Sequence, residues 1–267
     1  MDQYLKKFWS NHFQFNWKLG VFLILLFGIP RFIIVLQSYV DRSYGTVMFV
    51  FLSMWIVPFI LLTKYGRKGI GLKRPAHWWR IGVSFLSGGV ICLAIFGLFS
   101  FLYGQSVENA FVYIGGNNPS SGITGDDKLL YFTIAVIPSM IFSPIGEEFL
   151  YRGIIHGCFV PKFGETKASY FDSLAFALTH VAHFGIVYTL GTWCFLPIPA
   201  LLWVFSMFIV SQVFFRCKLY CDSLWGAIAA HSGFNFVMMY GIFYLLLSYY
   251  KTPLSVKHVS GIAEIIR

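Results

Sequence analysis

Long apolar runs separated by short polar segments follow one another along this 267-residue chain. A helix needs about 20 mostly apolar residues to cross the hydrocarbon core of a bilayer, and the chain supplies about seven runs near that length. The last run suits either one tilted span or a span followed by a short re-entrant piece. The pattern predicts an all-α fold, a polytopic transmembrane helical bundle of about seven membrane helices, with eight as the alternative. The runs cover residues 19–40, 45–63, 80–103, 129–155, 169–190, 193–215 and 222–250.

Composition agrees with a membrane location and excludes a water-soluble domain. Hydrophobic residues make up 57% of the chain and charged residues 12%, and the mean hydropathy is +0.70. The net charge of +9 does not point to nucleic acid, because the Lys and Arg residues lie in the loops between apolar runs. That placement fits anionic lipid and the excess of basic residues in cytoplasmic loops. We therefore expect the lipid bilayer, and no nucleic acid, as the surroundings of this protein.

Three segments are expected along the chain. Residues 1–18 mix aromatic residues with lysines, which is typical of an interfacial segment. Residues 19–250 form a single transmembrane helical domain, and residues 251–267 form a short polar tail. The first apolar run lacks the small-residue cleavage pattern of a secretory signal, so we expect it to be a retained span. The five cysteines are scattered and imply no disulfide framework.

Two adjacent carboxylates and a guanidinium, those of Glu147, Glu148 and Arg152, stand in the fourth apolar run. Ionised side chains at membrane depth are costly and mark functional sites by default. On a helix, Glu148 and Arg152 are four residues apart and can pair, whereas Glu147 projects onto the next face and is left without a partner. A carboxylate in such a site is a candidate general base. Pro138 and Pro144 remove backbone donors from this helix, which favours a water-containing cavity nearby.

Further polar residues interrupt other apolar runs. His180 and His183 lie in the fifth run, while His231 and Asn235 lie four residues apart on one face of the last helix. We expect His180, His231 and Asn235 to meet the two glutamates in one pocket in the cytoplasmic half of the bundle. Arg31 interrupts the first run, where it either turns into the bundle, snorkels to the interface or binds substrate.

Three short motifs occur in a fixed order. They are Glu-Glu-x-x-x-Arg at 147–152, Phe-x-x-x-His at 176–180 and His-x-x-x-Asn at 231–235. Each motif is weak alone, but the ordered trio resembles the CPBP or Abi family of intramembrane glutamic proteases, to which the CAAX prenyl endopeptidase belongs. The resemblance covers about residues 138–236, the expected catalytic core, and the first half of the chain adds nothing to it.

The resemblance implies a role for each motif residue. Glu147 would activate the attacking water, and His180 would help to hold that water. His231 and Asn235 would stabilise the oxyanion, since donors preorganised in a water-poor pocket do so strongly.

The resemblance also implies supporting roles for the remaining polar residues. Glu148 and Arg152 would form the supporting pair, and His183, outside the motifs, would pack beside the site. The implied activity is a metal-independent endopeptidase without a cofactor, acting on a membrane-embedded or membrane-associated peptide or protein. The implied location is a bacterial cell membrane, with the N-terminus and the active site toward the cytoplasm.

Three other functions stay open at this point. Glu and His ligands from different helices could hold zinc, which would make a zinc-dependent membrane protease. A non-catalytic immunity or regulatory protein against bacteriocin-like peptides is a second alternative. A transporter is the third, because intramembrane carboxylates and histidines also build proton relays, although no internal repeat is evident.

Overall fold

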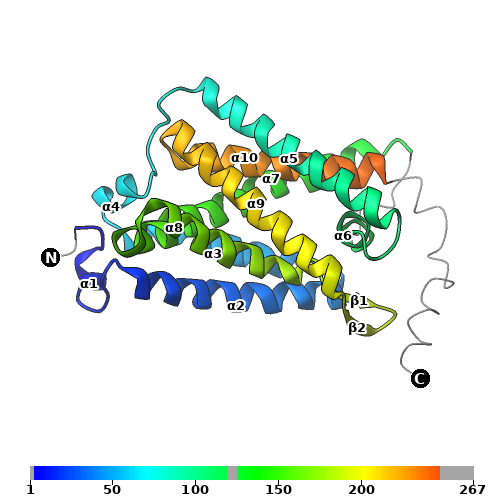
Figure 1. Cartoon of the computed structure of the whole chain (residues 1–267), viewed down its shortest axis with the longest axis horizontal. Coiled ribbons are helices and arrows are strands. Elements are labelled where there is room, and N and C mark those ends of the chain that lie inside the picture. The colour runs from blue at the N-terminus through cyan, green and yellow to red at the C-terminus, as the bar shows by residue number, and fades with distance from the viewer. Residues whose placement is uncertain (1–2, 119–124, 247–267) are drawn as a thin grey trace.

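The computed structural model describes residues 3–118 and 125–246, and the predicted tail at 251–267 lies outside them (Figure 1). Within these ranges, five helices are long and apolar enough to cross a membrane. The all-α, polytopic prediction is confirmed at this level, whereas the count of seven spans stays a prediction. The five are α2 (Trp17–Asp41), α5 (Trp79–Tyr103), the continuous run Lys128–Ala182, α9 (Pro197–Cys221) and the run Leu224–Leu245.

The longest run contains four helical elements in succession. They are α7 (Lys128–Glu148), the π-helix η1 (Phe149–Ile155), α8 (His156–Thr179) and the 3₁₀ turn η2 (His180–Ala182). Gly164 interrupts α8 with a φ of 74°, so two helices meet there at a kink. The other helices are α1 (Lys7–Ser10), α3 (Gly45–Leu61), α4 (Lys64–Gly69), α6 (Ala110–Gly116), α10 (Leu224–Tyr240) and the π-helix η3 (Gly241–Leu245).

A small hairpin separates α8 from α9. Its strands β1 (Ile186–Thr189) and β2 (Thr192–Phe195) pair antiparallel. The predicted spans 169–190 and 193–215 both extend into this hairpin, so their boundaries there are wrong. The physical reason is local: Gly191 turns the chain with a φ of 82°, and the β-branched and aromatic residues beside it favour strands.

Helix α10 lies against α5, α7 and α9 and carries the last polar motif. Two glycines bring its backbone into direct contact with α5. A Cβ on Gly88 would collide with the carbonyl oxygen of Ala230, and a Cβ on Gly233 would collide with that of Phe85. Small residues permit this close approach between membrane helices.

The outer surface of the bundle is apolar, with exposed side chains such as Leu86 (66%), Phe101 (86%) and Leu201 (72%). Such a surface suits lipid and not water. Taken with the five apolar helices, it identifies an integral membrane protein.

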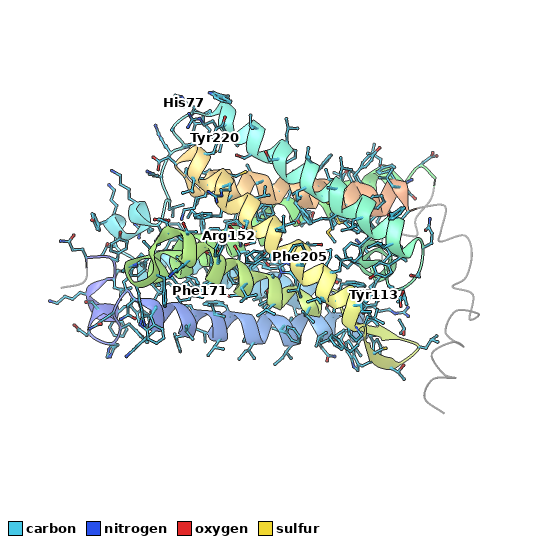
Figure 2. All side chains as sticks on the ribbon, in the orientation of Figure 1. His77, Tyr113, Arg152, Phe171, Phe205 and Tyr220 are labelled. Carbon is cyan, nitrogen blue, oxygen red and sulfur yellow. The ribbon has the colours of Figure 1, made fainter. Side chains whose placement is uncertain are left out.

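The two ends of the bundle differ in charge. We call the end with the N-terminus, α1 and α4 the basic end, and the end with α6, β1 and β2 the hairpin end (Figure 1). In Figure 2, His77 and Tyr220 lie toward the basic end, Tyr113 lies at the hairpin end, and Arg152 lies inside the bundle. The basic end takes its name from Lys64, Arg67, Lys68, Lys73 and Arg80.

Candidate active site

Glu147 and Glu148 close α7 in the interior of the bundle, with 1% and 0% of their surfaces exposed. Pro144 has no N–H for the carbonyl of Met140, four residues before it. Ser232 of α10 donates to that carbonyl instead, at 2.7 Å. A side chain from a neighbouring helix thus satisfies the carbonyl that Pro144 frees, and the bond links α10 to α7.

Glu148 joins two of the motifs. Its Oε2 lies 3.2 Å from Arg152 Nε, so the predicted pair at a spacing of four residues is confirmed. Its Oε1 lies 2.8 Å from His231 Nδ1. Because a carboxylate oxygen accepts the bond, His231 carries its hydrogen on Nδ1 and turns Nε2 toward Glu147, whose Oε2 is 3.9 Å away.

Glu147 is not left without a partner, so that expectation is wrong. Arg31 of α2 places Nη2 2.6 Å from Glu147 Oε1, and both side chains are 1% exposed. Arg31 also donates to Thr179 Oγ1 at 2.7 Å and lies 3.2 Å from His183 Nε2. The spacing of residues within one helix gives no sign of a cation contributed by another helix. Arg31 therefore points into the bundle and does not snorkel to the interface.

His180 is fixed by its own backbone and by neighbouring helices. Its Nδ1 donates to the backbone carbonyl oxygen of Phe176, four residues earlier, at 2.7 Å. Nε2 is then the acceptor nitrogen of the neutral ring, and it lies 3.4 Å from Arg31 Nη2. Trp203 Nε1 donates to the His180 carbonyl at 3.1 Å, which holds the η2 turn in place.

Asn235 connects the last motif to α7. Its Nδ2 donates to the carbonyl of Ser139 at 2.7 Å and to Ser143 Oγ at 3.2 Å. Both amide hydrogens are therefore engaged, and a substrate oxyanion would have to replace the longer bond to Ser143.

A series of buried, hydrogen-bonded polar side chains continues behind Arg152, and the sequence-based reasoning missed it. Arg152 Nη2 donates to Ser211 Oγ at 2.6 Å, and Ser211 donates to Ser173 Oγ at 2.6 Å. Asp172, beside Ser173, lies 2.7 Å from His156 Nδ1, and His156 Nε2 lies 2.9 Å from Glu165. A carboxylate at position 172 inside an apolar run was the available signal. From the surface inward the chain runs through Glu165, His156, Asp172, Ser173, Ser211 and Arg152.

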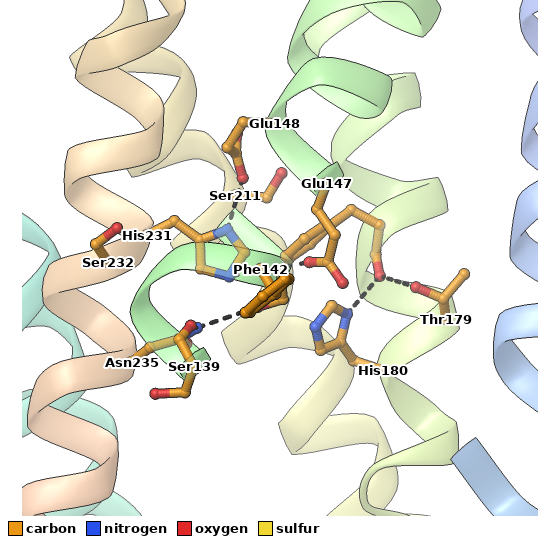
Figure 3. A network of polar contacts seen from close by, with 12 residues as sticks. Ser139, Phe142, Glu147, Glu148, Thr179, His180, Ser211, His231, Ser232 and Asn235 are labelled. Carbon is orange, nitrogen blue, oxygen red and sulfur yellow. Dashed lines mark hydrogen bonds and ion pairs between the residues drawn. The ribbon is translucent and has the colours of Figure 1, made fainter. Parts of the chain in front are cut away.

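A cavity of about 660 Å³ joins the motif residues. The four predicted catalytic residues, Glu147, His180, His231 and Asn235, all line it, and their side chains converge in Figure 3. Arg31 and His183 line it too, whereas Glu148 and Arg152 lie behind its wall. Within residues 3–118 and 125–246, no group of three or more His, Cys, Asp or Glu side chains is arranged to hold a metal ion.

Comparison with known proteins supports the resemblance drawn from the motifs. The model of the family described as "Type II CAAX prenyl endopeptidase Rce1-like" matches residues 129–237. This segment contains all three motifs and the helices that carry them, so the expected family resemblance is confirmed. No curated protein and no solved structure matches the chain.

Proposed function

We propose that this chain, whose residues 129–237 match the Rce1-like CAAX prenyl endopeptidase family, is an intramembrane glutamic endopeptidase. Its substrate is a membrane-associated or membrane-embedded peptide or protein. The observation that carries the proposal is the convergence of Glu147, His180 and His231, from three separate helical segments, on one buried cavity.

In the proposed reaction, Glu147 takes a proton from a water molecule while the water oxygen attacks the carbonyl carbon of the scissile peptide bond. The acceptor Nε2 of His180 orients that water. A base held within reach of the nucleophile contributes about 10²–10⁴ in rate. Glu147 then passes its proton to the leaving nitrogen as the C–N bond breaks, which leaves an acid, an amine and an ionised Glu147.

His231 needs a hydrogen on Nε2 to donate to the oxyanion. Its Nδ1 hydrogen is committed to Glu148, so the neutral ring has no hydrogen on Nε2 to donate. The imidazolium has one on each nitrogen, and the Nε2 hydrogen points to the side where Glu147 lies. The three side chains thus form a chain of contacts: Arg152 orients Glu148, and Glu148 orients His231.

We propose that this chemistry needs no metal ion or other cofactor. The guanidinium of Arg31 occupies the position beside Glu147 and supplies a fixed positive charge in the site. We further propose a bacterial cell membrane as the location, with the N-terminus and basic end in the cytoplasm, because Lys and Arg concentrate at that end.

The test compares peptides released from membranes that contain the wild-type protein or Glu147→Gln at equal abundance, with and without a chelator. Glu147→Gln keeps the shape of the side chain and removes the base, so we expect release to fall at least about 10²-fold. Glu108→Gln, which lies outside the cavity lining, is the matched control. Undiminished release by Glu147→Gln would refute the glutamate mechanism, and loss of release on chelation would favour the zinc alternative.

A further inference from the structure

The exposed residues that line the cavity around Glu147 all lie toward one end of the bundle. The walls of the cavity combine buried and half-buried residues with five exposed ones. All five belong to the turn after α2, the first turn of α3 or the first two turns of α7, and these segments lie at the hairpin end. The exposed lining residues, which we call the mouth, are Arg42, Ser43, Gly45, Met48 and Ile134.

The opposite end is closed by protein. Directly after Glu148, all seven residues of η1 are buried, and Leu150, Tyr151, Ile154 and Ile155 are each 0% exposed. On the same side Lys218 Nζ donates to the carbonyl of Arg152 at 2.6 Å, which ties α9 to η1. This buried π-helical segment therefore covers Glu147 on the side of the basic end.

The walls between the mouth and Glu147 are apolar and adaptable. Phe51, Phe142 and Trp203 supply aromatic surface, and Met207 and Met238 supply flexible thioethers that adjust to differently shaped side chains. The volume of about 660 Å³ falls in the range of about 300–1,000 Å³ typical of ligand pockets. It therefore accommodates a short extended peptide segment and no folded domain.

We propose that the substrate enters at the hairpin end, through the mouth, as a short, extended, apolar peptide segment. This inference rests on the proposed function for the identity of the substrate, but the position of the mouth is independent of that function. Because the basic end is assigned to the cytoplasm by its Lys and Arg residues, the mouth faces the other side of the membrane. That placement differs from the cytoplasmic active site expected from the sequence.

The first experiment measures access without requiring catalysis. Met238→Cys, in a Cys194→Ser background of the full-length protein, reports how fast a charged methanethiosulfonate reagent reaches the cavity, since the other four cysteines are buried. Gly45→Trp should narrow the mouth, because a side chain there meets only Ser43 Oγ, at 3.8 Å. Gly97→Trp is the matched control, since a side chain at that helical position meets nothing within 4 Å.

We expect Gly45→Trp to slow thiol modification at least several-fold and Gly97→Trp to leave it unchanged. Equal rates in the two variants would overturn the assignment of the mouth. The same variants are then compared in peptide release. If thiol access falls while release is unchanged, substrate entry through the mouth is refuted; if the wild type releases no peptide, the proposed function fails and the access result still stands.

A second measurement assigns the face. A membrane-impermeant thiol reagent is added to intact cells that carry Ser43→Cys at the mouth or Lys68→Cys at the basic end, both in the Cys194→Ser background. We expect Ser43→Cys to react from outside and Lys68→Cys to react only after permeabilisation. The reverse pattern would overturn the outward-facing placement.

Discussion

Replacing Arg31 by leucine should destabilise the protein through the charge that it leaves behind on Glu147. The two side chains are 1% exposed and their charged atoms lie 2.6 Å apart, so bulk solvent screens the pair little. Removing one partner of a buried ion pair costs about 3–5 kcal/mol, because the other charge stays buried and uncompensated. Arg31→Leu should therefore lower the free energy of unfolding by about that amount.

A double-mutant cycle separates the charge effect from the loss of packing. In Arg31→Leu/Glu147→Gln the buried negative charge is gone as well, so most of the lost stability should return. We expect a coupling free energy of about 2–3 kcal/mol, at the upper end of the range for residues in direct contact. The assay is reversible unfolding of the four proteins in mixed detergent micelles, followed by circular dichroism.

Arg42→Leu is the control, because Arg42 is exposed at the end of the same helix and should change stability by no more than about 0.5 kcal/mol. Two results would contradict the reasoning. One is a loss below about 1 kcal/mol in Arg31→Leu, far under the cost of an uncompensated buried charge. The other is strict additivity in the double variant, which would mean that the two side chains do not stabilise one another.

Four further outcomes are expected. Gly88→Ala should cost about 1–3 kcal/mol by overpacking against Ala230, whereas Gly97→Ala should be neutral in the same thermal unfolding experiment; equal melting temperatures would contradict the close contact of α5 and α10. His231→Ala should lower the maximal cleavage rate by about 10²–10³ with little change in KM, and an effect on KM alone would argue against an oxyanion role. Asp172→Asn leaves His156 without a buried carboxylate and should lower the unfolding free energy by about 1–3 kcal/mol, a loss that an unchanged melting curve would exclude. A chelator should leave peptide release unchanged. Release that is lost on chelation and restored by added zinc would contradict that expectation.

Much of the fold follows from local pattern, because a membrane helix must satisfy its backbone groups within its own segment. The apolar runs therefore located the long helices, but two regions were assigned wrongly. The gap expected between residues 155 and 169 is helical in α8, and the region of Gly185 to Phe195 forms a hairpin. In that region the residues stay apolar while the backbone turns into a hairpin, and hydropathy does not distinguish an apolar hairpin from an apolar helix. The pairing of Glu148 with Arg152 was equally local, since four residues of helix bring the side chains together.

The sequence by itself located the candidate residues for the proposed chemistry: two glutamates, two histidines and an asparagine in three ordered motifs. Only the tertiary structure decided what each of them faces. Arg31 reaches Glu147 from a helix more than a hundred positions earlier, and Glu148 receives His231 from α10. The exposed residues of the cavity lining lie at the hairpin end. These contacts depend on the rotation and depth of one helix against another, which helical periodicity within a single segment does not specify.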